Sequence, residues 1–192
     1  MFKRLLATAA ATAFLVGLIG CQSPAAPTTF DDGIFHDQAL SRRIAFYVGE
    51  GGVQPEELAQ FTELRLPAAG IRDITGLERF TNLQRLDLAK NDLTDLSPLA
   101  GLVKLEFLSL EENDIEDVSP LARLTGLKVL HLYKNRITDV APLASLTNLD
   151  ALSLENNRIT DGTSLSGLKV YGKIDWSGNE VDSEGNPQRS GK

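Results

Sequence analysis

Cysteine, basic residues and aromatic residues are all scarce in this sequence. It holds one Cys in 192 residues, so it can form neither an internal disulfide nor a Cys-based zinc or iron–sulfur site. Its 19 Lys and Arg are outnumbered by 26 Asp and Glu, which gives a formal net charge of −7. Because phosphate binding needs clustered cations, this balance argues against nucleic acid or anionic lipid headgroups as the main partner. With 42% hydrophobic and 23% charged residues, the composition is that of a folded chain.

Catalytic motifs are also missing. The two His, His36 and His131, lie far apart, and there is neither a G-x-S-x-G motif nor a phosphate-binding loop. His131 with Glu111 and Glu155 could in principle share a proton or a metal, but a single His on a strand is more typical of a polar contact. We therefore expect no enzyme activity, no bound metal and no cofactor.

The first twenty-one residues have the layout of an export signal. A basic segment, 1–4, precedes sixteen uncharged and mostly apolar residues, 5–20, and polar residues follow at once. This run is shorter than the about 20 apolar residues of a membrane-spanning helix, which disfavours a permanent transmembrane anchor. The one Cys ends the run, in Leu18-Ile19-Gly20-Cys21. One interpretation of Cys21 is a small apolar residue that closes the run.

The other interpretation is lipidation, because this tetrapeptide resembles the lipobox of bacterial lipoproteins. The resemblance implies cleavage before Cys21 and acylation of its thiol, and each buried methylene then contributes about 0.8 kcal/mol to membrane binding. Gln22 after the Cys implies the outer membrane of a two-membrane bacterium. Cleavage removes two cations and no carboxylate, so the net charge becomes −9. We predict a signal peptide over 1–20, and the lipidated Cys with a flexible Pro-, Ala- and Thr-rich tether over 21–32.

A 22-residue repeat governs the sequence from Phe61 onward. Five full units end at residue 170, and an incomplete sixth follows. Three consecutive units share one pattern, which the second unit shows as Leu83, Leu86, Leu88, Asn91, Leu93, Asp95, Leu96, Pro98, Leu99 and Leu102. This pattern resembles the leucine-rich repeat. Its length and its T/E-D-V/L-S/A-P-L segment resemble the bacterial internalin-like subfamily.

Each unit is expected to form one short strand and one tight return. Leu86 and Leu88 are two residues apart and so share one face of a strand, which a single unit cannot bury. Six stacked strands about 4.8 Å apart predict a sheet about 25 Å wide. Ser97 and Ser119, each before a Pro, predict a capping hydroxyl at a 3₁₀-like turn. The predicted fold is an α/β leucine-rich-repeat solenoid, with parallel strands on the concave face and turns and 3₁₀ segments on the convex face.

Two polar columns accompany the leucines. An Asn recurs where the chain leaves each strand, and its amide is expected to bond to the backbone of the bend in a structural ladder: Asn91, Asn113, Asn135, Asn157 and Asn179. An Asp recurs four residues later: Asp73, Asp95, Asp117, Asp139 and Asp161. One carboxylate per turn supplies too few oxygens for calcium, so we expect these Asp to form hydrogen bonds within the turns.

The ends depart from the repeat. Residues 33–60 are predicted to form a small α-helical N-terminal cap, whose first helix is opened by Asp37, and this resembles the cap of internalin-like proteins. The repeats are predicted over 61–182 and a polar tail over 183–192. Trp176 occupies an inward position of the sixth unit, and we expect it to cover the last exposed turn rather than to form a binding site.

The concave face is where the repeat leaves residues free to vary. Its centre is predicted to carry an aromatic and apolar patch with a charged rim, an arrangement typical of binding hot spots. The predicted partner-binding residues are Asp87, Phe107, Ser109, Glu111, Val129, His131, Tyr133, Ala151, Ser153 and Glu155. The alternative is that aromatic and β-branched residues simply suit strands.

Three functional hypotheses follow. The leading one is a monomeric, lipid-anchored, noncatalytic module of the bacterial cell envelope that binds another protein. The second is a glycan or cell-wall binding protein, in which Phe107 and Tyr133 stack on sugar rings beside the carboxylates. The third is a spacer without a ligand.

Overall fold

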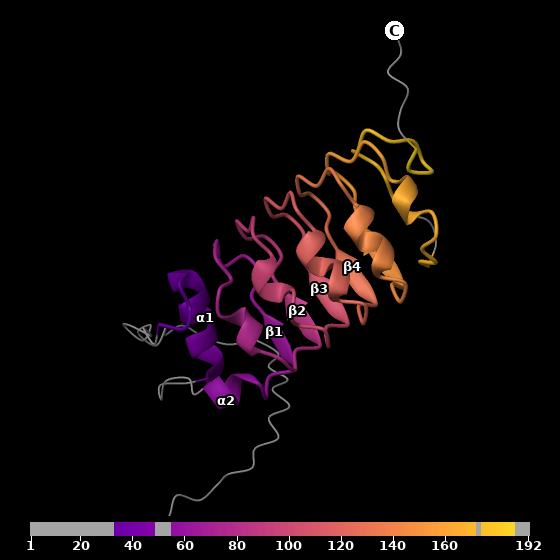
Figure 1. Ribbon diagram of the computed structural model, residues 1–192. Coiled ribbons are helices and arrows are strands. Elements are labelled where there is room, and N and C mark those ends of the chain that lie inside the picture. Colours follow the sequence, from indigo (N-terminus) through magenta and orange to yellow (C-terminus); the bar gives the residue numbers. More distant parts are fainter. Residues whose placement is uncertain (1–32, 49–54, 172–173, 187–192) are drawn as a thin grey trace, which may run out of the picture.

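The computed structural model of the chain describes residues 33–48, 55–171 and 174–186 (Figure 1). The predicted signal peptide, the tether and Cys21 lie outside the described residues, as does the end of the predicted tail. Within these three segments, no helix is both long and apolar enough to cross a bilayer.

Five short parallel strands form one sheet in sequence order. They are β1 (Glu63–Arg65), β2 (Arg85–Asp87), β3 (Phe107–Ser109), β4 (Val129–His131) and β5 (Ala151–Ser153). The register equals the repeat, since each residue pairs with the one 22 positions later, as Leu86 does with Leu108. Neighbours in sequence are therefore neighbours in space, and the units stack as a solenoid (Figure 1). The predicted leucine-rich-repeat fold is confirmed.

The sixth predicted strand is not formed by its described residues, 174–176. The sixth unit still pairs with the fifth, where the Asn156 N–H donates to the Ser177 carbonyl at 2.8 Å. Five strands about 4.8 Å apart make the sheet about 19 Å wide rather than 25 Å.

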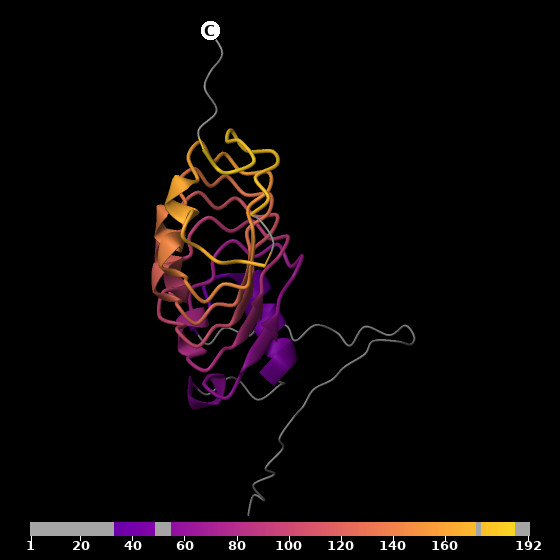
Figure 2. The ribbon, with the colours of Figure 1, turned by 90° about the vertical axis from the view of Figure 1, so that its right-hand side faces the viewer.

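The return of each unit is a single turn of 3₁₀ helix on the side opposite the sheet (Figure 2). These turns are η1 (Leu77–Arg79), η2 (Ser97–Leu99), η3 (Ser119–Arg123), η4 (Ala141–Ser145) and η5 (Thr163–Leu165). Pro is the second residue of η2, η3 and η4, where an N–H would have no partner within the turn.

The prediction that a Ser hydroxyl caps these turns is wrong. Ser97 and Ser119 provide no side-chain cap, and the N-cap positions are Leu96 and Val118. The Asp column holds the turns instead, since Asp95 Oδ1 accepts the backbone N–H of Ser97 at 2.8 Å and its hydroxyl at 2.6 Å. The Ser97 hydroxyl and N–H together lower the pKa of Asp95. Asp95 precedes Ser97 by two residues, which is the spacing of an Asx-type turn.

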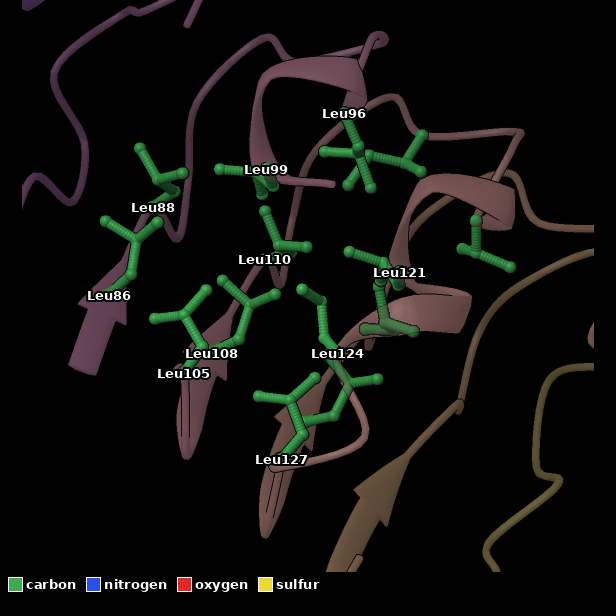
Figure 3. Packing of buried hydrophobic residues seen from close by; sticks show 14 of the residues in the cluster. Leu86, Leu88, Leu96, Leu99, Leu105, Leu108, Leu110, Leu121, Leu124 and Leu127 are labelled. Carbon is green, nitrogen blue, oxygen red and sulfur yellow. The ribbon is translucent and has the colours of Figure 1, made fainter. Parts of the chain in front are cut away.

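The core lies between the sheet and the 3₁₀ turns. Leucines from each strand and each return meet there and interdigitate with those of the next unit (Figure 3). Leu86, Leu108 and Leu130 are fully buried, and so are Leu99 and Leu121 on the opposite wall. Burial of one such side chain stabilises the fold by about 2 kcal/mol. Because no unit buries its leucines alone, the stability of the fold comes from contacts between neighbouring units.

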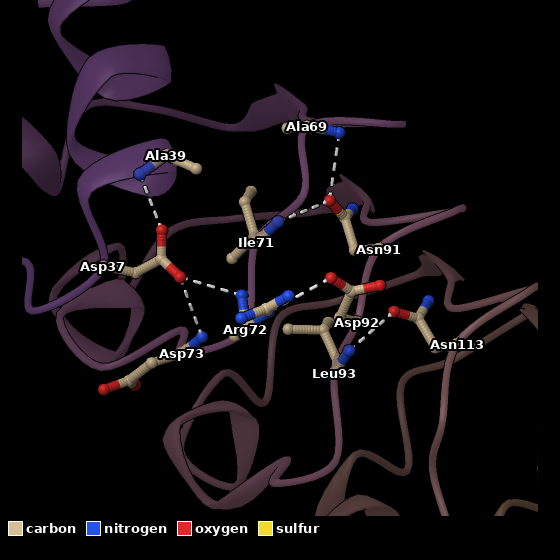
Figure 4. A network of polar contacts seen from close by, with 10 residues as sticks. All are labelled: Asp37, Ala39, Ala69, Ile71, Arg72, Asp73, Asn91, Asp92, Leu93 and Asn113. Carbon is tan, nitrogen blue, oxygen red and sulfur yellow. Dashed lines mark hydrogen bonds and ion pairs between the residues drawn. The ribbon is translucent and has the colours of Figure 1, made fainter.

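The N-terminal cap covers the first unit with α1 (Gln38–Val48) and α2 (Pro55–Leu58). Asp37 joins the cap to the repeats, as Figure 4 shows. One carboxylate oxygen accepts the N–H of Ala39 and Leu40 at the start of α1, and the other accepts those of Arg72 and Asp73 at 2.8 and 3.2 Å. Burial alone would raise the pKa of Asp37, but these four N–H groups outweigh it, so the pKa is lowered.

Candidate functional site

The predicted site residues lie side by side because the sheet is in register. Phe107 pairs with Val129, and Val129 with Ala151, so these three form one row across β3, β4 and β5. Ser109, His131 and Ser153 form the next row. Each strand keeps its middle leucine inward, which turns the flanking residues toward the concave surface.

Aromatic rings are held in place by neighbours on this face. The rings of Phe107 and His131 lie 5.6 Å apart between centroids at an interplanar angle of 76°. The Arg85 guanidinium lies over the Phe107 ring, 4.4 Å from its centroid. The Lys134 ammonium lies 5.0 Å from the centroid of Tyr133. The Tyr133 hydroxyl, followed by Glu112, raises the pKa of Lys134, which therefore stays cationic.

Carboxylates border the rings. Asp87 Oδ1 accepts the N–H of Ala89 at 3.0 Å, so this side chain is held by its own turn. Glu155 differs, because its Oε2 is buried and has no hydrogen-bond partner among the described residues. Such an oxygen costs free energy until a donor reaches it. Glu111, Val129, Tyr133, Ala151 and Ser153 are all half-buried, so the surface is shallow and open rather than a deep pocket.

Ser109 departs from the prediction in its accessibility. Only 4% of it is exposed, whereas the other nine predicted residues are half-buried. A short hydroxyl in the centre of the sheet lies below the larger side chains beside it. Ser109 therefore offers a partner almost no surface.

The Asn residues lie behind this face and bind backbone only. Asn135 Nδ2 donates to the carbonyls of Leu110 at 2.9 Å and Leu132 at 3.0 Å, and its Oδ1 accepts the N–H of Ile115 at 3.1 Å. The same bonds recur at Asn91, Asn113, Asn157 and Asn179, so each Asn ties its own turn to the preceding unit. These bonds engage the Nδ2 donors of each Asn with backbone carbonyls.

His131 lies among serine and glutamate residues of the concave face. No hydrogen bond joins His131 to Ser109, to Ser153 or to either neighbouring Glu, although Ser109 and Ser153 are its register partners. The described segments also contain no group of three or more His, Cys, Asp or Glu side chains placed to hold a metal ion. The Asp column is engaged in its turns, as at Ser119 N–H to Asp117 Oδ1, 2.7 Å.

Solved structures share this architecture. The chain is 33% identical to an internalin C2 from Listeria monocytogenes, covering 84% of this chain and 82% of that one, with a TM-score of 0.61. The family described as Leucine Rich repeats (2 copies) matches residues 81–123 and 125–169. The chain belongs to the internalin-like leucine-rich repeat family.

Two further structures are similar at lower identity and over a smaller part of the chain. An internalin, InlF, from Listeria monocytogenes is 30% identical over 79% of this chain, with a TM-score of 0.59, and the chain spans 53% of it. The BIR2 ectodomain of Arabidopsis thaliana is 26% identical over 66% of this chain and 69% of its own, with a TM-score of 0.53. No curated protein matches the sequence significantly.

Arg85 is the residue of this internalin-like face that the sequence prediction missed. It lies over Phe107, yet it was not among the ten predicted contact residues. A signal was available, because Arg85 precedes Phe107 by one repeat and the register makes them direct neighbours. A cation one repeat before an aromatic residue in a parallel stack therefore predicts a cation–π contact.

Proposed function

We propose that this internalin-like chain is a lipid-anchored, noncatalytic module of the bacterial cell envelope that binds another protein on its concave face. The lipobox-like Leu18-Ile19-Gly20-Cys21 supports the anchor, and the stacked repeats support the binding role. Leucine-rich-repeat solenoids present extended concave surfaces for binding. A partner with one small domain, or one that also touches the loops, would suit a sheet about 19 Å wide.

This proposal rests mainly on the fixed orientation of the aromatic rings at the centre of the concave face. Phe107 and His131 contact each other, and Arg85 covers Phe107, so little rotamer freedom remains to be lost on binding. Rigid aromatic residues beside an Arg are the usual composition of protein hot spots. A donor from the partner would also satisfy the buried Oε2 of Glu155.

The same geometry weakens the glycan alternative. Stacking on a sugar ring requires a free aromatic face. Arg85 occupies a face of Phe107, and the Lys134 ammonium lies 5.0 Å from the centroid of Tyr133. A glycan would have to displace these cations first. We therefore favour the protein partner.

Replacement of the rings tests the binding role. Phe107→Ala with Tyr133→Ala should weaken capture of an envelope protein by about thirtyfold, because removal of a hot-spot anchor costs about 2 kcal/mol. The measurement is the Kd of the captured protein, with Tyr171→Ala as the control, since Tyr171 is 85% exposed in the sixth unit, after β5. Retention of polysaccharide alone would favour the glycan alternative. Equal binding by both variants, or no retained macromolecule, contradicts the proposal.

Replacement of Cys21 tests the anchor separately. Cys21→Ser removes the thiol that would be acylated, so the chain should move from the membrane fraction to the soluble fraction and lose incorporation of labelled fatty acid. Ser23→Ala, two residues later, is the matched control and should leave both unchanged. An anchor at Cys21 is wrong if the Cys21→Ser chain still carries the label.

A further inference from the structure

The outer face of α1 carries a large exposed aromatic residue between two arginines. Phe46 is 80% exposed, and Arg42 and Arg43 precede it by four and three residues. At 3.6 residues per turn, both arginines lie one turn from Phe46, on either side of it. The opposite side of the helix is buried through Leu40, Ile44 and Ala45, which fixes this face outward.

Arg42 and Arg43 form no ion pair among the described residues, and the same is true of Arg79, Arg85, Arg123 and Arg158. Arg65, Arg72 and Arg136 each form an ion pair, at 2.7, 3.2 and 2.6 Å respectively. Neither Arg42 nor Arg43 has an ion-pair or hydrogen-bond partner among the residues that the structure describes. Two free cations beside an exposed ring stand out in a chain of net charge −7.

We propose that this face of α1, formed by Arg42, Arg43 and Phe46, docks on the anionic surface of the bilayer that holds Cys21. Aromatic rings suit the boundary between headgroups and acyl chains, and Arg side chains bind lipid phosphates. The inference rests on the proposed lipid anchor, which brings α1 close to the membrane. Cys21 precedes Gln38 by 17 residues, and that length of chain reaches at most about 60 Å.

A membrane fits this face better than a protein does. One ring and two arginines on an 11-residue helix offer little of the about 800 Å² that a standard protein interface buries per partner. A bilayer needs no matching shape, and the charge complementarity with phosphates is direct. Docking through α1 would hold the solenoid by its N-terminal end, since α1 covers the first unit (Figure 1). The concave face would then stay open to a partner.

Indole fluorescence tests this docking in the anchored protein. The full lipoprotein with Phe46→Trp is placed in vesicles of phosphatidylethanolamine and phosphatidylglycerol with brominated acyl chains, which quench indoles at the bilayer boundary. We expect strong quenching. The matched control is Tyr171→Trp, an equally exposed aromatic position in the sixth unit, and it should show none. The parent chain reports the baseline, because its single Trp, Trp176, is buried.

The role of Arg42 and Arg43 is tested in the Phe46→Trp protein. Arg42→Gln with Arg43→Gln should lower the ratio of docked to undocked protein about thirtyfold, since each Arg near an anionic surface contributes about fivefold. Equal quenching at positions 46 and 171, or quenching that survives loss of both arginines, overturns the proposal. Vesicle flotation separates the two failures: protein that floats without quenching keeps its anchor but does not dock, and protein that does not float lacks both.

Discussion

Asn135→Ala is expected to lower the free energy of unfolding by about 4 kcal/mol. The substitution removes three hydrogen bonds and leaves the buried Ile115 N–H without a partner. The Leu110 and Leu132 carbonyls each lose one bond but keep a second one, from Asn113 and Asn157. The unsatisfied N–H costs about 1–3 kcal/mol, and each of the two lost carbonyl bonds costs about 1 kcal/mol more. Because a domain is stable by only about 5–15 kcal/mol, this change takes a large part of the total.

Urea unfolding measures this effect with two signals. Circular dichroism follows the whole stack, and Trp176 fluorescence follows its C-terminal end. A solenoid is held by contacts between neighbours, so the two transitions should separate when the middle ladder residue is removed. Asn148→Ala is the control, since Asn148 is exposed and makes one bond, to the Thr125 carbonyl at 2.8 Å. A similar loss in both variants would show that the ladder adds nothing beyond an ordinary surface bond.

The repeat made most of the fold predictable from the sequence. Inward leucines, the register and the 3₁₀ returns all follow from spacing, because a parallel stack converts a period of 22 residues into lateral contact. The ladder was predictable for the same reason, since an Asn that recurs at a bend has backbone groups to bind. The concave rows followed from strand alternation.

Local competition between side chains was not predictable. Ser97 and Asp95 were both expected to serve the turn, and spacing alone does not show that the Ser97 hydroxyl donates to the Asp95 carboxylate instead of capping the turn. The low exposure of Ser109 depends on the size of its neighbours, which the alternation of a strand does not express. Arg85 reaches Phe107 through one rotamer of a long side chain.

At the last turn, the large side chain of Trp176 is matched by the absence of a side chain at Gly162. Units three and four place Val118 and Val140 where the fifth has Gly162, and earlier units place a Leu where the sixth has Trp176. A Cβ on Gly162 would lie 2.8 Å from Trp176 Cζ2, so the missing side chain makes room for the indole. Gly185 also lies close to the indole, and its carbonyl accepts the Gly162 N–H at 2.7 Å. Trp176, 6% exposed, thereby seals the core.

Each single substitution at this pair should therefore destabilise the protein, and the double substitution should recover much of the loss. Gly162→Val overpacks the site at a cost of about 3 kcal/mol, and Trp176→Leu leaves a void at a similar cost. Together they restore the Val and Leu of the earlier units, so the combined loss should be smaller than the sum by about 2 kcal/mol. Thermal unfolding of the four proteins by circular dichroism gives this coupling. Gly167→Ala is the control, because a Cβ there meets nothing within 4 Å. If the two losses of stability were strictly additive, the missing side chain at Gly162 would not be what makes room for the Trp176 indole.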